Sequence, residues 1–326
     1  MDQMTIGMEK ELWSIEQYRP GFSREWDRFV EESRNGTFLL TRPYMDYHAE
    51  RFADCSLIAR KGTRVRALLP ANLSEDGILH SHQGLTYGGW ILPQAHFDGG
   101  DMLDLFGVWR KWCLEVGITE VDYKPIPWIY HSLPGQEDLY ALFRYGAIMN
   151  EVNLSSTVTL TNRRPFNSQQ RRNLRDARCA GGIVAETEDI EEFHALLASC
   201  LAERHDTTPV HTAAELRLLH ERFPDKIRFF AAYLGDRMAG GVCVYDCGQC
   251  VHAQYIASTP EGRSNGVLAL IFDYLLAEVY ADRRYFDFGI SNEEHGRYLN
   301  YGLISQKSGL GGTGVIYSRY HLRFRE

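Results

Sequence analysis

The stretch VHAQYIASTPEGRSNGVLALIFDYLLAEVYADRRYFDFGIS, residues 251–291, contains the order of elements that decides the fold. It begins with a strand, passes through a loop that contains Gly262, and continues as an apolar helix from about Gly266. A second buried strand, YFDFGIS, follows this helix. Because a strand, helix, strand connection is the crossover of a parallel pair, the two strands are predicted to be parallel neighbours.

The segments upstream extend this pattern into a mixed sheet. IRFFAAYL, MAGGVCVY and VHAQYIAS are separated by short turns, so they form an antiparallel meander. Before them, residues 162–182 form a polar, arginine-rich helix. Two further helices follow it, one capped by Asp189 with Glu192 and the other by Thr212 with Glu215.

The first half of the chain repeats this order. SLIAR, VRALLPA and a strand approaching His80 form a meander, a helix capped by Asp101 follows, and ITEVDY is the next buried strand. Val121 and Tyr285 lie 164 residues apart, as do Met102 and Gly266, which indicates an internal structural repeat. The predicted fold is therefore α/β with mixed sheets flanked by helices, in two domains spanning residues 1–160 and 161–326.

Composition limits the possible class of protein. Of 326 residues, 44% are hydrophobic and 24% charged, which is typical of a globular protein. A net charge of −8 argues against a protein that uses its whole surface to bind nucleic acid. The amino-terminal residues lack the pattern of a signal peptide, no apolar run is long enough for a membrane span, and the seven cysteines are scattered. We expect a cytoplasmic protein without a membrane span.

The loop PEGRSNG, residues 260–266, is a candidate phosphate site. Its glycines permit close approach of the backbone, N–H groups are exposed at the start of the helix, and Arg263 adds positive charge. The edge of VHAQYIAS could pair with the amides of pantetheine, so coenzyme A fits this region. The alternative is an ordinary polar turn. The predicted donor-binding residues are Ile256, Ala257, Ser258, Gly262, Arg263, Ser264, Asn265 and Gly266.

Catalytic candidates lie on the strand VHAQYIAS and after the strand YFDFGIS. Strict alternation places His252, Gln254 and Ile256 on one face and Tyr255 on the other. A structural role for His252 stays open. Attack on a thioester requires a base and donors for the oxyanion. The bases proposed are Asp287, His252 and His295, and the oxyanion donors are Lys307 or the backbone N–H groups of residues 256–258.

Other polar residues suit an acceptor. The segment HSHQGLTYGGW combines histidines, an amide, aromatic rings and glycines, a composition that suits a sugar ring, although a tight hairpin would explain it equally well. The residue His211 either faces a ligand or only precedes the Thr212 cap. The predicted substrate residues are Gln83, Tyr87, His211, Gln254, Tyr255, Ser291 and Asn292.

Two local clusters have alternative explanations. The arginines of residues 163–178 form either a solvated helix face or a phosphate-binding surface. Cys243, Cys247 and Cys250, together with His252, do not match the ligand spacing of a standard zinc site. No metal ion is predicted.

The motifs FDFGIS, LNYGLISQK, HAQYI and RRNLRDARCAGG together resemble the Fem-type branch of the GNAT acyltransferase superfamily. The resemblance covers most of the chain, because HQGLTYGG and PIPWIYH also resemble the amino-terminal half of such proteins. It implies tandem GNAT domains, with the donor in the second and the acceptor held between them. Lys307 matches the lysine of the Phe-Lys pair found in Fem-type relatives, and Gln306 replaces the phenylalanine. This difference favours acyl-CoA over aminoacyl-tRNA as the donor.

The predicted function is transfer of an acyl group from acyl-CoA to an amine or hydroxyl. The acceptor class implied is an amino sugar, a nucleotide-sugar or a cell-surface glycan precursor, as in polysaccharide biosynthesis. Two alternatives stay open: a Fem-type aminoacyl transferase, for which tRNA would be a partner, and a catalytically silent binding protein. The oligomeric state is not determined by the sequence.

Overall fold

The computed structural model describes residues 12–205 and 207–325, and the chain divides into two units. The first unit is Met1–Asn150 with Arg319–Glu326, and the second is Glu151–Ser318. The sequence places the boundary at residue 160 and leaves the carboxyl-terminal segment in the second half. In the structure, the last strand instead pairs with β7 of the first unit.

The described part of the first unit contains two small sheets and four α-helices. Strands β1 (Trp13–Gln17), β3 (Leu57–Lys61) and β4 (Arg64–Leu69) form an antiparallel sheet. A mixed sheet has the order β2 (Ala53–Asp54), β5 (Asn72–Leu73), β6 (Leu79–His80), β7 (Glu120–Tyr123) and the end of β16 (Thr313–Arg323). The helices are α1 (Ser23–Glu32), α2 (Arg42–Met45), α3 (Gly99–Glu115) and α4 (Glu137–Arg144).

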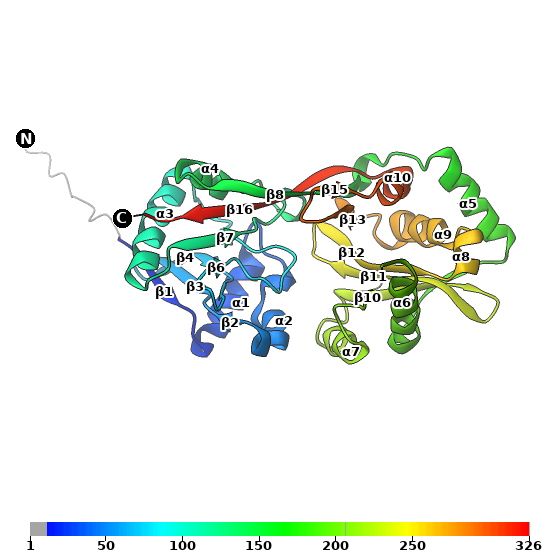
Figure 1. The fold of residues 1–326 in the computed structure, drawn as a ribbon, viewed down its shortest axis with the longest axis horizontal. Helices are drawn as coiled ribbons and strands as arrows, with labels where there is room; N and C mark the ends of the chain where they lie inside the picture. Colours follow the sequence, from blue (N-terminus) through cyan, green and yellow to red (C-terminus); the bar gives the residue numbers. More distant parts are fainter. Residues whose placement is uncertain (1–11, 206, 326) are drawn as a thin grey trace, which may run out of the picture. The chain divides into compact units, whose positions relative to one another are not determined.

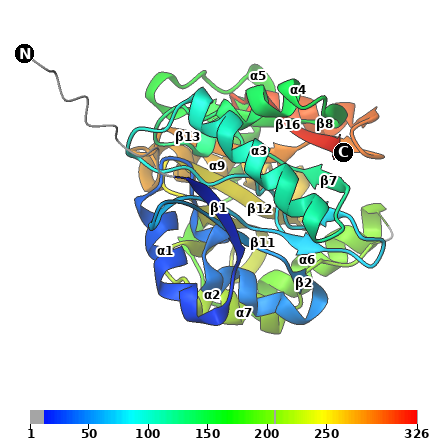
Figure 2. The same cartoon turned by 90° about the vertical axis from the view of Figure 1, so that its left-hand side faces the viewer.

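Helix α3 covers the first unit's core, as Figure 2 shows. Its apolar face follows helical spacing and buries Leu105, Phe106 and Trp109 among others. The cap differs from the sequence prediction: the side chain of Asp98, and not that of Asp101, accepts the N–H groups of Gly100 and Asp101. Two consecutive glycines therefore lie inside the helix rather than before it.

In its described residues, the second unit contains a mixed sheet covered by helices on both faces. The sheet order is β8 (Ile148–Thr159), β13 (Tyr285–Ile290), β12 (Cys250–Ser258), β11 (Arg237–Asp246), β10 (Ile227–Leu234) and β9 (Ile183–Glu186). Its longer helices are α5 (Ser168–Cys179), α6 (Ile190–His205), α7 (Ala213–Arg222), α9 (Val267–Tyr274) and α10 (Tyr301–Gly309). Short elements are α8 (Pro260–Ser264), β14 (Asn292–Glu293) and β15 (Tyr298–Leu299).

Alternation along the strands separates the two faces of this sheet. Phe230, Val251 and Phe286 share one core with α9, whereas Phe229 contacts Phe193 of α6 with ring centroids 5.2 Å apart. Figure 1 shows α5 and α9 on one side of β10–β12 and α6 and α7 on the other. Asp287 lies between Phe286 and Phe288, so its side chain is on the face opposite to α9.

Each unit contains one parallel strand pair, and the pairs correspond. In the first unit, His80 of β6 pairs in register with Asp122 of β7. In the second unit, His252 of β12 pairs in register with Asp287 of β13. Within the described residues, the other registered strand pairs are antiparallel. Both parallel pairs are joined by a helical crossover, which is the repeat that the sequence predicts.

Replacing Gly262 with alanine tests the packing of α8. An added Cβ would lie 2.0 Å from the carbonyl oxygen of Ala239, and that backbone atom cannot move without disturbing β11. We expect Gly262→Ala to lower the free energy of unfolding by about 1–3 kcal/mol, measured by urea denaturation. Gly99→Ala is the matched control, because no atom lies within 4 Å of its added Cβ. Equal stability of the two variants would contradict this account.

Candidate active site

The parallel strands β12 and β13 separate at their carboxyl ends. They pair over Cys250–His252 and Tyr285–Asp287. Beyond this stretch and within the described residues, β13 keeps only its other partner, β8, with which Ile290 pairs at Ser155. From residue 253 to 258, β12 continues with β11 as its partner among the described strands. The opposite edge of β12 is therefore open beside this point of separation, where α/β proteins commonly bind ligands. Ile256, Ala257 and Ser258 lie on this part of the strand.

A β-bulge at Gln254 changes which side chains of β12 share a face. Ala253 pairs with Val244 and Tyr255 with Cys243, so Gln254 is the extra residue. Ile256 consequently packs on the α9 side of the sheet with Val251 and Ala253. Tyr255 is brought to the side of His252. The alternation predicted from the sequence is wrong for Tyr255 and Ile256, because a two-residue period takes no account of a bulge.

Asp287 is the centre of a buried hydrogen-bond cluster. Its carboxylate accepts bonds from Ser155 Oγ at 2.5 Å, Thr157 Oγ1 at 2.7 Å, His252 Nδ1 at 2.9 Å and Tyr317 OH at 2.9 Å. Burial alone would raise the pKa of Asp287, but the bonds from His252, Ser155 and Thr157 hold it below its ordinary value. The structure therefore contains a carboxylate that is ionised although its side chain is fully buried.

The bond to Asp287 sets the orientation of the His252 imidazole. When Nδ1 donates to Asp287, the lone pair of the neutral ring is on Nε2. The His252 side chain is 13% exposed. Gly289 has a left-handed backbone conformation with φ of 78°, and an added Cβ would lie 3.3 Å from His252 Cε1. A glycine at this position thus leaves space for the imidazole.

Lys307 adds a buried cation at the same end of β13. Its Nζ donates to the carbonyl oxygens of Gly289 at 2.9 Å and Ile290 at 2.6 Å, and the residue is 5% exposed. Burial lowers the pKa of Lys307 to about 8, although the negative charge of Asp287 opposes the shift. The structure thus brings together His252, Asp287 and Lys307, the three predicted catalytic residues, while their catalytic role stays a prediction.

Four of the predicted substrate residues have contacts with β12 or with β8 near the end of β13. His211 Nδ1 and Tyr255 OH are 2.5 Å apart and link the start of α7 to β12. Ser291 donates its backbone N–H to Leu154 O at 2.9 Å, and Asn292 Oδ1 accepts the N–H of Leu154 at 2.5 Å. Ser291 and Asn292 therefore hold the end of β13 against β8.

The predicted phosphate loop has its own internal contacts. Thr259 caps α8 by accepting the N–H of Gly262, and Arg263 donates to Ser258 O at 2.7 Å and lies 3.3 Å from Glu203. Gly266, with φ of 72°, lets Asn173 of α5 approach: an added Cβ would be 2.5 Å from the Asn173 oxygen. Ser264 Oγ and Asn265 Nδ2 both donate to Glu261 O. These contacts explain the two glycines by packing, and binding of a phosphate by residues 262–266 stays a prediction.

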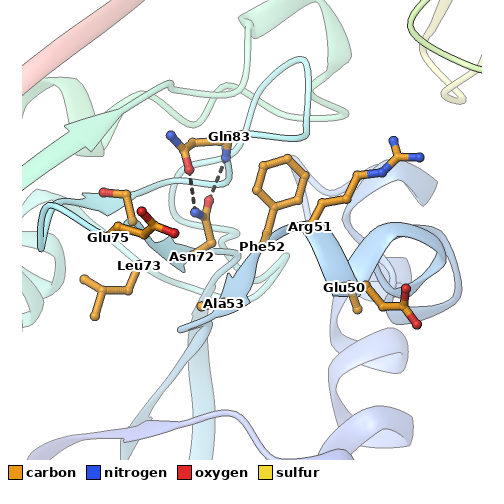
Figure 3. Close-up of a pocket in the computed structure, with 10 residues that line it drawn as sticks. Glu50, Arg51, Phe52, Ala53, Asn72, Leu73, Glu75 and Gln83 are labelled. Atoms are coloured by element: carbon orange, nitrogen blue, oxygen red, sulfur yellow. Dashed lines mark hydrogen bonds between the residues drawn. The ribbon is translucent and has the colours of Figure 1, made fainter.

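A pocket of about 440 Å³ lies in the first unit and is drawn in Figure 3. Gln83 lines it and is held by Asn72, whose amide donates to Gln83 Oε1 at 2.7 Å and accepts the Gln83 N–H at 2.8 Å. Phe52, Ser74 and Glu75 also line this pocket. The other predicted acceptor residue of this unit, Tyr87, is 2% exposed and packs in the core against Tyr130, because its segment turns inward.

Sequence reasoning missed three of the groups that bind Asp287. Ser155 and Thr157 alternate along β8, and two hydroxyls on one face of a buried strand were a usable signal. Tyr317 is on β16, and nothing in its local sequence indicates this contact. The candidate base His295 is outside the cluster: its side chain is 85% exposed and lies 3.5 Å from Glu151.

Metal binding is not indicated by the described part of the chain. Among the residues described there, no three His, Cys, Asp or Glu side chains cluster so that they could hold an ion. Burial raises the pKa of Cys243 and Cys250 well above the usual value of a thiol. These two side chains are therefore protonated residues of the core.

Lys307→Met tests whether the buried ammonium stabilises the fold. The folded-state pKa of about 8 is below the ordinary lysine value, so folding disfavours the proton and the charge costs up to about 3 kcal/mol below pH 8. Loss of the two carbonyl contacts offsets part of this gain. We expect Lys307→Met to be at least as stable as the wild type at pH 7, measured by urea denaturation.

The pH dependence provides the control for this substitution. Wild-type stability should rise relative to Lys307→Met between pH 8 and about 10.5, where the unfolded chain binds the proton and the folded chain does not. A variant that is clearly less stable than the wild type at pH 7 would contradict this and show that the ammonium stabilises the fold.

Comparisons with known proteins bear on the fold. The family model "Acetyltransferase (GNAT) domain" matches residues 163–297. No curated protein matches the sequence. FemX has a similar structure, with a TM-score of 0.67 and 12% identity over 95% of this chain and 97% of FemX.

Two further solved structures are similar over nearly their whole length. L-PGS from Bacillus licheniformis has a TM-score of 0.59 and 11% identity, covering 95% of this chain and 94% of that chain. A tandem GNAT protein from the clavulanic acid biosynthesis pathway has a TM-score of 0.51 and 12% identity, covering 96% and 99%. Residues 163–297 therefore match the family model of a GNAT acetyltransferase domain, and the fold of the whole chain is similar to that of FemX and of a tandem GNAT protein.

Proposed function

We propose that this protein is an acyltransferase that moves an acyl group from acyl-CoA to the amine of an amino sugar or a related glycan precursor. The observation that carries the proposal is the cluster of His252, Asp287 and Lys307 where β12 and β13 separate. The GNAT fold supports acyl transfer in general. The choice of donor and acceptor rests on the features described below.

The open edge of β12 supports a thioester with a pantetheine arm. Amide groups of the arm would pair with residues 253–258 as a further strand does, and the thioester carbonyl would then lie near His252 and Lys307. The loop of residues 260–266 follows directly and would take the pyrophosphate. A donor containing coenzyme A also fits a cytoplasmic location, which the scattered cysteines favour.

His252 is the residue best placed to accept a proton. As the acceptor nitrogen attacks the thioester carbon, a C–N bond forms and the nitrogen loses a proton to His252 Nε2. Asp287 stays ionised and stabilises the protonated imidazole through Nδ1. The tetrahedral intermediate then collapses, the C–S bond breaks, and the thiolate leaves and is protonated.

Lys307 is the candidate for stabilising the oxyanion. Two of its three N–H donors bind the carbonyls of Gly289 and Ile290, which fixes the position of the ammonium. The third would bind the negative oxygen that forms on the thioester carbonyl. Backbone N–H groups of residues 256–258 are the alternative donors for this oxygen.

The pocket of the first unit supports a sugar acceptor. It combines the aromatic ring of Phe52, the amide of Gln83 and the hydroxyl of Ser74. Aromatic rings stack on sugars, and amides and hydroxyls bind their hydroxyl groups. A Fem-type aminoacyl transferase is the second candidate, favoured by the exposed arginines of α5, which would suit the phosphates of tRNA.

His252→Ala tests the proposed base. We expect kcat to fall about 10²- to 10⁴-fold because no other group would accept the proton, while the Kd for acyl-CoA stays the same. Acyl transfer to a panel of amino sugars and thermal shift with acyl-CoA are the measurements. A saturating ligand at a hundred times its Kd should stabilise the wild type by about 2.7 kcal/mol.

His295→Ala is the matched control, since this histidine is exposed and outside the cluster. It should leave kcat unchanged. Full activity of His252→Ala would remove the proposed base. An absence of any acyl-CoA response in the wild type, with transfer from aminoacyl-tRNA, would establish the second candidate instead.

The pH dependence of kcat tests Lys307 separately. The ammonium stabilises the oxyanion only while it is charged, so kcat should fall as the pH rises through the Lys307 pKa of about 8. In Lys307→Arg the side chain stays charged, so this decline should move to much higher pH even if the rate is lower. An unchanged decline near pH 8 in Lys307→Arg would assign it to another group.

A further inference from the structure

Helix α5 lies directly against the loop that joins α8 to α9. Gly266 of that loop contacts Asn173 of α5, and Gly182, just after α5, contacts Leu270 of α9. In Figure 1, α5 runs beside α8 and α9. The middle of α5 therefore lies next to the predicted phosphate loop.

The exposed surface of α5 is strongly positive although the whole chain has a net charge of −8. Arg163 and Arg178 share one ion-pair partner, Asp273 of α9, at 3.4 Å and 2.8 Å. Arg164, Arg171, Arg172 and Arg175 are exposed, and the acid nearest to Arg175 is Asp176 at 3.8 Å.

These positive charges lack an equivalent set of carboxylates. Among the described residues, no carboxylate lies within ion-pair distance of Arg164, Arg171 or Arg172, and Glu261 of α8 is 3.6 Å from Arg237 instead. Like charges on one helix repel each other, so they destabilise it unless an anion binds.

We propose that the exposed arginines of α5, with Arg172 and Arg175 at the centre, bind phosphate groups at the nucleotide end of the acyl donor. This inference rests on the proposed function. Arg172 and Arg175 are three residues apart and share one exposed face of α5, while Asn173 on another face of the helix touches the loop at Gly266. Guanidinium groups bind phosphate oxygens with paired hydrogen bonds, and helix α5 presents several within about 18 Å.

Two kinds of donor would bring phosphate groups to these arginines. Coenzyme A carries a pyrophosphate and a 3′-phosphate, and an aminoacylated RNA carries a chain of phosphodiesters. Both would place phosphates beside residues 260–266 and α5. The two sources differ in length and charge, so binding measurements separate them.

The test uses the double variant Arg172→Glu/Arg175→Glu in the full chain. Within the described part of the chain, neither side chain has a hydrogen bond to another element, so the fold should be kept, which is checked by thermal unfolding. Arg222→Glu, at the end of α7 on the other face of the sheet, is the control for charge reversal. Calorimetry measures the Kd of coenzyme A, of 3′-dephospho-coenzyme A, and of a short single-stranded RNA.

We expect the double variant to bind coenzyme A at least tenfold more weakly, with a smaller loss for the dephospho form, and Arg222→Glu to bind as the wild type does. RNA binding that the double variant loses, with no binding of coenzyme A by the wild type, would support the surface but make RNA the donor, which overturns acyl-CoA in the proposed function. A loss confined to the RNA, with coenzyme A bound equally by both proteins, would overturn the inference for coenzyme A. Equal affinities of the wild type and the double variant for both ligands would overturn the inference and leave the proposed function intact. A wild type that binds neither ligand would overturn both.

Discussion

The buried carboxylate of Asp287 is the constraint on which the second unit depends. An ionised group without exposure is tolerated only when hydrogen bonds replace its water shell. Ser155 and Thr157 of β8, His252 of β12 and Tyr317 of β16 provide these bonds. The register of β13 with β8 and β12 is therefore fixed by this charge. If β8 or β12 shifted by one residue, the carboxylate of Asp287 would lose the hydrogen-bond donors of that strand.

Lys307 adds a second buried charge of opposite sign at the end of the same strand. Its contacts are backbone carbonyls of Gly289 and Ile290 rather than a carboxylate, so the ammonium is held in place without being neutralised in a direct ion pair. A buried cation of this kind lowers stability, as its depressed pKa indicates. Proteins commonly keep such costly groups where function requires them, which is the physical reason for the proposal that the chemistry takes place at this strand end.

The sequence predicts much of this fold but not its departures from regularity. The crossover from VHAQYIAS to YFDFGIS and the caps at Asp189 and Thr212 depend on local patterns, and the structure confirms them. The bulge at Gln254 was not predictable, because alternation assumes one residue per pleat. Tyr317 reaches Asp287 from β16, and the return of β16 to the first unit also moves the boundary from the predicted position. Both depend on pairing between strands far apart in the sequence.

In each unit, a histidine pairs in register with an aspartate on the neighbouring parallel strand, but the two aspartates bind groups of different charge. In the first unit, His80 lies 3.2 Å from Asp122, and the guanidinium of Arg319 also binds this carboxylate, whose pKa is lowered to about 2. A permanent cation already neutralises Asp122, so little negative charge remains to stabilise a protonated imidazole. Asp287 instead receives neutral hydroxyl donors besides His252, which satisfy the carboxylate and leave its charge for the imidazole. Of two similar pairs, the second is thus the one suited to accept a proton, because its aspartate is bound by hydroxyls and not by an arginine.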